Sequence, residues 1–419
     1  MTISTAHTHP DAWRPARLKF AAPLRNERMS ANSDHADYLG LENIESWTGR
    51  IIEAESKLDD ATDDGSAGLS NVFREGDVLF GKLRPYLAKA CHAPRDGICS
   101  TELLVMRPAE YLHPRFLLYS LLTPDFVGAV DASTFGAKMP RASWDFIGAL
   151  DIRIPPIDAQ SLIANYLDRE TVRIDGLIAD KERMLALLEE KRAALISRVV
   201  THGLNTDLPM KPSGLEWLGE IPTHWQIERA KNLFTVRDER SDDGSEELLT
   251  VSHITGVTSR SEKDVYMFEA DDKAGYKRCL PGDLAINTLW AWMGAMGISP
   301  LGGIVSPDYH VYTSKGQLLP QYIDLLCRSR PFVAEVNRWS KGVWSSRLRL
   351  YPENFFEMRL PIPPHDEQRA IVKAIQADQR KANSLREALQ QSITLAKERR
   401  AALITAAVTG KIPLEGMVA

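Results

Sequence analysis

Apolar residues recur with heptad-like spacing in two long stretches of this chain. In the first stretch one heptad position is held by Leu167, Ile174, Leu188 and Leu195, and Ile178, Leu185 and Val199 fall four residues after that position in the repeat. In the second stretch the position is held by Ile375, Ala382, Leu389, Ala396 and Leu403, with Leu385 and Ile393 alongside. A stripe of this period predicts a long helix that buries the stripe against a partner helix. Because the chain contains two such stripes, we predict an intramolecular coiled coil of two helices of about 40 residues, each on the order of 60 Å long.

The two helical stretches belong to a duplication. Identical residues recur at an offset of 208: Pro155 and Pro363, Pro156 and Pro364, Gln160 and Gln368, and the segments 192–196 and 400–404. Upstream, Gly76-Asp77 matches Gly282-Asp283 at an offset of 206. A period this long is not that of a solenoid repeat. We therefore interpret it as the duplication of a whole domain together with its helix.

The globular parts combine strand and helix patterns. Alternating runs predict strands over 38–44 and 248–254, and Gly-Asp turns at Gly76 and Gly282 lead into a β-rich run in each half. The spacing of large apolar residues predicts one amphipathic helix over 114–130 and another over 320–336. A last strand is expected over 146–154 and over 355–362.

The predicted fold class is α+β, with two similar domains of mixed sheet plus helices separated by two long helices. The predicted boundaries are a first domain over 1–154, a first long helix over 155–204, a second domain over 205–362 that starts with a linker to about 222, and a second long helix with a C-terminal tail over 363–419.

Overall charge does not indicate a nucleic-acid-binding protein. The 419 residues carry a net charge of −5, so any such surface must be local. The N-terminus lacks the apolar core of a signal peptide. The uncharged stretch 284–307 is long enough to cross a bilayer, but its counterpart in the first half contains Lys82, Arg84, Lys89 and Arg95. We therefore expect β-structure there, a cytoplasmic location and no membrane partner.

Common catalytic motifs are absent from the sequence. There is no G-x-x-x-x-G-K-[ST] phosphate loop, no G-x-G-x-x-G after a strand, and neither Pro-Pro pair follows Asn or Asp as in amino-methyltransferases. His365, Asp366 and Glu367 resemble an acid–base group, but their place after Pro364 is typical of a helix start. We expect no catalytic residue in this chain.

The four cysteines are Cys91, Cys99, Cys279 and Cys327, and they form no C-x-x-C pair. Cys91 and Cys99 lie near His92, so either a metal site or reduced core thiols fit the pattern. Thiols in the core are the interpretation we adopt, with no metal bound.

Two short basic segments interleave with aromatic residues in this acidic protein. Residues 78–95 and residues 336–350 each contain four basic and no acidic side chains. Lys and Arg can neutralise phosphates, while Arg, Ser and aromatic side chains can reach base edges. A solvated loop with a packing Trp has the same composition, and charge alone does not separate the two interpretations. The candidate DNA contacts here and in the loop 131–141 are Lys82, Arg84, Tyr86, Lys89, Lys138, Arg141, Trp290, Trp292, Arg338, Lys341, Trp344, Ser345, Ser346, Arg347 and Arg349.

The framework repeats whereas these loops do not. Lys82, Arg84 and Tyr86 stand where the second half has Thr288, Trp290 and Trp292. Two similar domains with different contact loops fit two different targets. In the second domain we expect residues 341–349 to face the DNA.

These features resemble those of the specificity subunit of type I restriction-modification systems. The shared features are the Gly-Asp strand entries at Gly76 and Gly282, the Pro-Pro-x-x-x-Gln helix starts at Gln160 and Gln368, the [KR]-R-A-A-L-I helix ends, and the tandem order of domain and helix. The resemblance implies two target recognition domains that read the halves of a split, asymmetric site in double-stranded DNA. It also implies an antiparallel coiled coil that sets the spacing of the half-sites.

The resemblance further implies protein partners. Two modification subunits are expected to dock and methylate adenine with S-adenosylmethionine, and restriction subunits, where present, use ATP and Mg²⁺. The chain itself is then expected to bind no cofactor. Two alternatives remain: a coiled-coil scaffold without sequence-specific DNA binding, and an enzyme that methylates or cuts DNA by itself.

Overall fold

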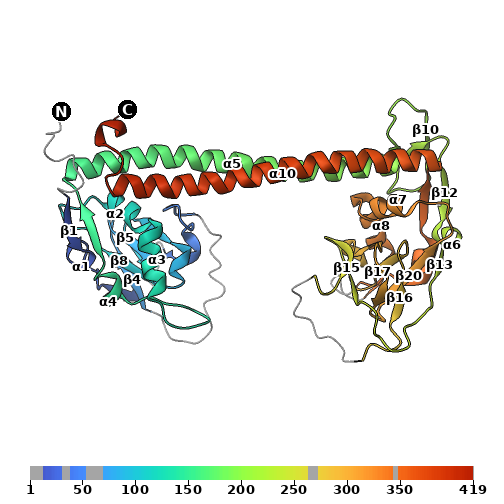
Figure 1. Ribbon diagram of the computed structural model, residues 1–419, viewed down its shortest axis with the longest axis horizontal. Coiled ribbons are helices and arrows are strands. Elements are labelled where there is room, and N and C mark those ends of the chain that lie inside the picture. Colours follow the sequence, from blue (N-terminus) through green and yellow to red (C-terminus); the bar gives the residue numbers. More distant parts are fainter. Residues whose placement is uncertain (1–12, 31–37, 53–68, 263–271, 343–347, 419) are drawn as a thin grey trace. The chain divides into compact units, whose positions relative to one another are not determined.

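The computed structural model describes residues 13–30, 38–52, 69–262, 272–342 and 348–418. The chain forms two compact units, one of residues 1–182 and 390–419 and the other of residues 183–389. Helices α5 (Ile157–His202) and α10 (His365–Val408) each contribute one part to each unit (Figure 1). Each unit therefore consists of a globular part and its own segments of the two long helices, whereas the predicted boundaries placed the helices outside both domains.

The first unit is built around strand β5 (Val78–Gly81), which lies between β6 (Ala90–His92) and β8 (Leu103–Met106) in an antiparallel sheet. Val78 and Phe80 face one hydrophobic cluster and Leu79 faces another, as the alternation of a strand buried on both faces requires. Phe80 packs edge-on against Phe126 of α3, with ring centroids 5.7 Å apart. The elements of this globular part are β1 (Arg14–Arg17), α1 (Leu18–Ala21), β2 (Arg28–Ser30), β3 (Tyr38–Leu39), β4 (Leu69–Phe73), β5 (Val78–Gly81), β6 (Ala90–His92), β7 (Gly97–Cys99), β8 (Leu103–Met106), α2 (Pro114–Leu121), α3 (Pro124–Ala132), α4 (Trp144–Ile147) and β9 (Asp151–Ile154).

The second unit repeats this plan around β17, which lies between β18 and β20. Leu284 and Ile286 face one cluster and Ala285 faces the other. The uncharged stretch 284–307 therefore forms β17, β18 and β19, and no helix in the described part of the chain is long and apolar enough to cross a membrane. The elements here are β10 (Met210–Pro212), β11 (Glu220–Pro222), β12 (Gln226–Arg229), α6 (Ala230–Leu233), β13 (Phe234–Val236), β14 (Leu249–Ser252), β15 (Gly256–Ser259), β16 (Lys277–Cys279), β17 (Leu284–Asn287), β18 (Met296–Ile298), β19 (Gly303–Val305), β20 (Tyr309–Ser314), α7 (Pro320–Cys327), α8 (Arg330–Trp339), α9 (Pro352–Glu357) and β21 (Arg359–Ile362).

The duplication extends to single hydrogen bonds. Arg25 Nε donates to Asp77 Oδ2 at 2.7 Å, and Arg237 Nε donates to Asp283 Oδ2 at 2.6 Å. In both units a second bond of 3.1 Å joins Nη2 to Oδ1, so each arginine holds its carboxylate with two parallel bonds. The aspartate of each Gly-Asp turn is therefore the anchor of the strand that follows.

A buried glutamine fixes the start of each long helix. The side chain of Gln160 accepts a hydrogen bond from His113 N at 2.7 Å and donates to Tyr111 O and Pro155 O. Gln368 repeats all three contacts, with Leu319 N, Gln317 O and Pro363 O. These bonds attach the helix start to the segment before α2 or α7, which explains the Pro-Pro-x-x-x-Gln spacing in the sequence.

Each predicted amphipathic helix is two helices in the structure. The prediction of one helix over 114–130 is wrong because α2 ends at Leu121 and α3 begins at Pro124. The helix predicted over 320–336 likewise divides into α7 and α8, with Pro331 in the first turn of α8. Proline lacks an N–H and is accommodated in a first turn but not in a helix interior. Thr123 completes the break, since its Oγ1 accepts a hydrogen bond from Phe126 N.

Other predicted elements are shorter than expected. The run 38–44 is a strand only at Tyr38–Leu39 and continues as a 3₁₀ turn, Leu41–Asn43. The segments 146–154 and 355–362 end in strands β9 and β21, but α4 and α9 occupy their beginnings. Helix-start signals explain both cases, since Ser143 caps α4 and Pro352 opens α9. The predicted linker to 222 contains the hairpin β10–β11.

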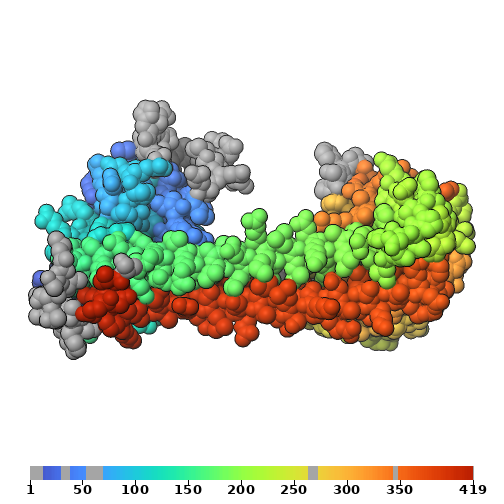
Figure 2. Space-filling model, turned by 90° about the horizontal axis from the view of Figure 1, so that it is seen from above, coloured from blue at the N-terminus to red at the C-terminus, as the bar shows by residue number. Residues whose placement is uncertain are grey.

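Within each unit α5 and α10 lie side by side (Figures 1 and 2). In the first unit Asp175 pairs with Arg400 and Glu182 pairs with Lys397, so the helices run antiparallel. In the second unit Glu189 pairs with Arg386. The pairs Glu182–Lys397 and Glu189–Arg386 are exposed and contribute little to stability, so the apolar stripe carries most of the packing.

Most of the predicted stripe is buried, and its ends pack into the globular cores. Leu167, Ile174, Ile178, Ile375, Leu389 and Ile393 are buried, while Leu185, Leu188, Leu195 and Leu403 are half-buried. Leu167 and Leu403 pack in the core of the first unit, and Leu195 and Ile375 in that of the second. The prediction for Leu385 is wrong, because its side chain is 45 % exposed. The buried seam of α10 passes instead from Ala382 to Leu389 at a step of one heptad.

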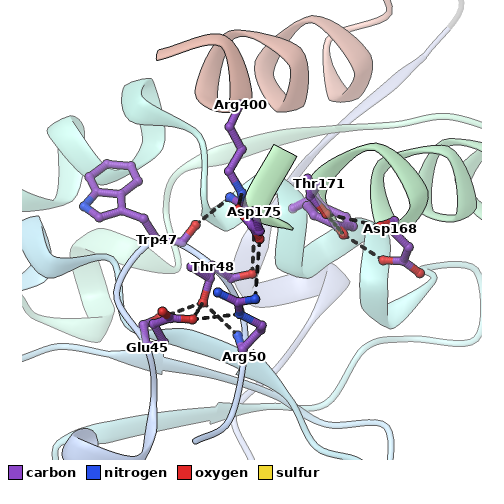
Figure 3. Close-up of polar contacts among 9 residues, drawn as sticks. Glu45, Trp47, Thr48, Arg50, Asp168, Thr171, Asp175 and Arg400 are labelled. Carbon is purple, nitrogen blue, oxygen red and sulfur yellow. Dashed lines mark hydrogen bonds and ion pairs between the residues drawn. The ribbon is translucent and has the colours of Figure 1, made fainter. Parts of the chain in front are cut away.

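A buried arginine joins α10 to the loop 45–50 of the first unit (Figure 3). Arg400 donates from Nε to Asp175 Oδ1 at 2.9 Å, from Nη1 to Trp47 O at 2.7 Å and from Nη2 to Thr48 O at 3.2 Å. The guanidinium thus binds α5, α10 and the loop together in one unit.

Candidate nucleic-acid interface

In the first unit, backbone hydrogen bonds bring together the two loops that the sequence singled out. Residues 82–89 follow β5, and residues 131–142 comprise the last two residues of α3 and the segment after it. Two bonds join them: Ala142 N donates to Lys82 O at 2.9 Å, and Arg84 N donates to Pro140 O at 2.8 Å. We call residues 82–89 and 131–142 the first-unit loop surface.

Exposed basic and apolar side chains share this surface. Arg84 and Lys138 are exposed, as are Tyr86, Phe135 and Met139. Phe135 is 64 % exposed and was not among the candidate contacts. In the sequence Phe135 can be noticed as a large apolar residue in a loop, where neither a helical nor a strand period places it in the core. Such side chains can contact a thymine methyl group or wedge between bases.

The backbone at Arg84 is held in an uncommon conformation. Arg84 has φ 49° and Ala88 has φ 46°, on either side of the 3₁₀ turn Pro85–Leu87. A residue with a Cβ in this left-handed region costs roughly 1–2 kcal/mol. The Arg84–Pro140 hydrogen bond and the complete burial of Ala88 offset this cost in free energy. The position of Arg84 is therefore set by tertiary contacts.

Arg141 is paired with a carboxylate from another segment. Its Nε lies 3.1 Å from Glu102 Oε1 and 3.2 Å from Oε2, and its Nη2 lies 3.0 Å from Oε1. These bonds raise the pKa of the Arg141 guanidinium. Glu102 is 39 residues from Arg141, and nothing in the local sequence pattern indicated the pairing.

Lys89 differs from the other basic candidates of this unit. Its Nζ donates to Leu41 O at 2.6 Å, and its side chain is half-buried. Lys89 therefore stabilises the turn at Leu41–Asn43. The prediction from sequence made Lys89 a DNA contact and did not include this role. Lys82 is half-buried, and its backbone carbonyl accepts the hydrogen bond from Ala142 N that joins the two loops.

The second unit repeats the loop pairing with different side chains. Leu350 N donates to Thr288 O at 3.3 Å, in the place of the Ala142–Lys82 bond, and Lys341 and Arg349 exchange two backbone bonds of 2.9 Å each. Residues 288–294, 338–342 and 348–350 form the second-unit loop surface. The candidates Trp344, Ser345, Ser346 and Arg347 lie outside the described residues.

On the second-unit loop surface Trp290 takes the place that Arg84 has in the first unit. Trp290 is 48 % exposed and stacks on Trp292, with ring centroids 6.3 Å apart and planes 23° apart. Trp292 is oriented by a hydrogen bond from its Nε1 to Leu289 O at 3.0 Å. A stacked indole pair offers a flat apolar contact rather than a charged one.

The basic side chains of this surface come from the segment after α8. Lys341 and Arg349 are exposed. Arg338 is 62 % exposed and pairs with Glu216 at 3.2 Å and Glu335 at 3.7 Å. The pair with Glu216 is exposed on both sides and is worth at most about 1 kcal/mol, so a phosphate can replace Glu216 as the partner of Arg338.

The other polar candidates are part of the framework. Asp366 and Glu367 lie in the first turn of α10, which confirms the helix-start interpretation. Glu367 Oε2 accepts a hydrogen bond from Trp225 Nε1 at 2.9 Å and lies 2.7 Å from His224 Nε2.

All four cysteines are buried. Burial raises the pKa of the Cys91 and Cys99 thiols to about 12, so both are protonated at neutral pH and unreactive. In the part of the chain that the structure describes, no three His, Cys, Asp or Glu side chains are grouped to hold a metal ion.

No protein-family model matches the chain. In sequence the chain is similar to the EcoDI specificity subunit of a type I restriction enzyme from Escherichia coli, with 22 % identity over 190 residues. That match covers 45 % of this chain and 41 % of the length of the relative.

Similarity in structure extends further. A chain from a structural study of complex assembly and conformational transition of the type I R-M system matches with a TM-score of 0.72 and 19 % identity, covering 96 % of this chain and 98 % of the other. The HsdS subunit from Thermoanaerobacter tengcongensis matches over the same shares with a TM-score of 0.51 and 19 % identity. The predicted α+β fold with two long helices is confirmed by these matches. The chain resembles the specificity subunit of type I restriction-modification systems, in fold over nearly its whole length and in sequence over part of it.

Proposed function

We propose that this chain is the DNA-recognition subunit of a type I restriction-modification complex. Each unit reads one half of a bipartite, asymmetric site in double-stranded DNA, and the chain itself catalyses nothing. One observation carries the proposal: a duplicated framework joins two loops at the same place in both units, but the side chains on those loops differ. Equivalent frameworks with unlike surfaces fit two unlike half-sites.

The chemistry of the two loop surfaces supports DNA as the ligand. Arg84, Lys138 and Arg141 on the first surface, and Lys341 and Arg349 on the second, can neutralise phosphates or reach base edges. Because the whole chain has a net charge of −5, the attraction to DNA comes from these local groups. Binding therefore weakens as salt is raised, in proportion to the number of phosphates contacted.

The partners in this proposal are two modification subunits, which hold S-adenosylmethionine, and restriction subunits where the host has them, which use ATP and Mg²⁺ in the cytoplasm. The long helices offer these partners an apolar surface. The exposed large apolar side chains on α5 and α10 are Ile157, Val172, Leu177, Met184, Leu187, Leu385 and Leu395. Side chains of this kind become favourable contacts when a partner excludes water from them.

Deletion of the gene followed by sequencing of methylated bases in the host genome tests the proposal. A bipartite methylated motif should disappear on deletion and return when the gene is supplied on a plasmid. An unchanged methylome would contradict the proposal.

A substitution on the first loop surface provides a sharper test. Arg84→Ala should weaken binding of the assembled complex by about 1–3 kcal/mol and relax the sequence requirement of one half-site only. Arg173→Ala removes an exposed charge from α5, where Arg173 pairs with Glu170, and serves as the control. If the two substitutions had equal effects, the assignment of DNA binding to the first-unit loop surface would be wrong.

A coiled-coil scaffold is the second candidate function. The apolar side chains on the helices favour it, because a scaffold needs them and does not need the loop surfaces. For a scaffold, Arg84→Ala would leave both assembly and methylation unchanged.

A further inference from the structure

We propose that Arg141 reads a guanine in the half-site of the first unit, and that Glu102 is the positioning residue that orients the guanidinium for this contact. The inference rests on the proposed function and deepens it, because it names one base of a target that the sequence does not reveal.

The backbone of Arg141 is rigidly held at the centre of the first-unit loop surface. Arg141 N donates to Phe135 O at 3.0 Å, and Phe135 N donates to Arg141 O at 3.1 Å. The next residue, Ala142, is buried and bonded to Lys82 O. A base-reading side chain needs such an anchor, because ordering a mobile loop on binding would cost affinity.

Glu102 holds one edge of the guanidinium. The carboxylate engages Nε and Nη2 of Arg141 at 3.0–3.2 Å. Glu102 is itself fixed, since its N donates to Ser100 Oγ at 3.2 Å and its O accepts from Lys82 N at 3.0 Å. Among the described residues no hydrogen bond occupies Nη1. The end of the fork formed by Nη1 and Nη2 is therefore available to a ligand, in a side chain that is 37 % exposed.

The chemistry of this free edge selects guanine. Guanine presents two acceptors in the major groove, O6 and N7, and an arginine fork matches both. Adenine presents a donor beside its N7, which the N–H groups of Arg141 would oppose. A phosphate is disfavoured, because the carboxylate of Glu102 beside it would repel its charge. A neutral base edge carries no such penalty.

The second unit offers an internal comparison. Asp308 stands at the position of Glu102 at the offset of 206, and Arg349 precedes Leu350 as Arg141 precedes Ala142. Among the described residues, however, Arg349 forms no ion pair with Asp308, and its side chain is exposed. Arg349 is therefore a matched residue without the orienting carboxylate.

The test uses the complex assembled with its modification subunits and duplexes that contain the methylated motif. Each guanine of the motif is replaced in turn by 7-deazaguanine, which lacks the N7 acceptor. One guanine of one half-site should show a loss of affinity of roughly 10- to 100-fold with the wild-type chain. Arg141→Ala should show a similar loss on the unmodified duplex and no further loss with 7-deazaguanine at that position. Arg349→Ala should leave the response to that 7-deazaguanine unchanged.

Glu102→Gln separates positioning from a merely structural role. The substitution should reduce discrimination between guanine and adenine at the same position. It should also strengthen binding to non-specific DNA, because a negative charge near the phosphates is removed. A purely structural role predicts weaker binding to every sequence. Arg141→Lys provides a second variant in case Arg141→Ala fails to fold, since it keeps the charge but lacks the fork.

Two results would overturn the inference. One is that no 7-deazaguanine position distinguishes the wild-type chain from Arg141→Ala. The other is that Arg141→Ala weakens cognate and non-cognate binding equally and lowers the salt slope by about one, as loss of a phosphate contact does. If the wild-type complex binds no bipartite motif at all, the proposed function fails rather than the role of Arg141.

Discussion

Arg400 and Arg192 hold the same position in the two copies of the long helix, but only Arg400 has a buried carboxylate partner. Arg400 and Asp175 are both about nine-tenths buried and lie 2.9 Å apart. In the second copy Asn383 replaces Asp175 at the offset of 208. Arg192 Nε is buried without a hydrogen-bond partner among the described residues, and the Arg192 side chain borders a groove of about 580 Å³.

Arg400→Ala should therefore destabilise the chain far more than Arg192→Ala. Removal of Arg400 leaves the Asp175 carboxylate and two backbone carbonyl groups in a buried place without their donor. Breaking a buried pair in this way costs roughly 3–5 kcal/mol. Urea denaturation followed by circular dichroism measures the difference. Equal shifts of the unfolding midpoint in the two variants would show that the Arg400 network contributes little.

Gln160→Ala and Gln368→Ala should each lower the free energy of unfolding by about 3 kcal/mol, because each leaves buried backbone groups unpaired. Both glutamines are completely buried and make the same three bonds. Gln390→Ala, at an exposed position of α10, is the control and should change stability by less than about 0.5 kcal/mol. A small effect of Gln160→Ala would mean that water or a neighbouring group replaces the amide.

Leu389→Ala and Leu385→Ala test which residues form the seam between the helices. Leu389 is 8 % exposed and Leu385 is 45 % exposed. The first substitution should cost about 2–3 kcal/mol by loss of buried apolar volume, and the second less than about 1 kcal/mol. Thermal unfolding of the two variants compares them directly. The reverse order would place Leu385 in the seam, as the heptad pattern predicted.

Stability should fall as the pH is lowered from about 6.5 to about 4, in part because of His310. Burial, and then the charge of Lys277, lower the pKa of His310 to about 4, while Glu353 and Asp308 act in the opposite direction. In the unfolded chain the pKa is about 6.5. Between these values the unfolded state binds a proton that the folded state does not, so stability is complete above pH 6.5 and is lost toward pH 4.

His310→Gln should make this dependence shallower, as measured by urea midpoints across the pH range. His92 and His113 also have lowered pKa values because of burial, so part of the slope should remain. If stability depended on pH with the same slope in the variant and the wild-type chain, His310 would not contribute to that dependence.

Local patterns predicted the framework well. The heptad stripe located both long helices to within a few residues, and the Gly-Asp turns located β5 and β17, because these signals act over a few neighbouring residues. The errors also have local causes. Pro124 and Pro331 divide the predicted helices, although the helical spacing of apolar residues continues across both prolines.

Local patterns in the chain were enough to predict the duplication, the two long helices and the contrast between a repeated framework and unlike loops. Three features became visible only in the folded chain: loops 82–89 and 131–142 form one surface, Lys89 binds Leu41 O, and Glu102 faces Arg141. The difference lies in the range of the interactions. Helix and turn signals depend on adjacent residues, whereas these contacts join groups 39 to 60 positions apart and depend on how sheets and helices bring them together.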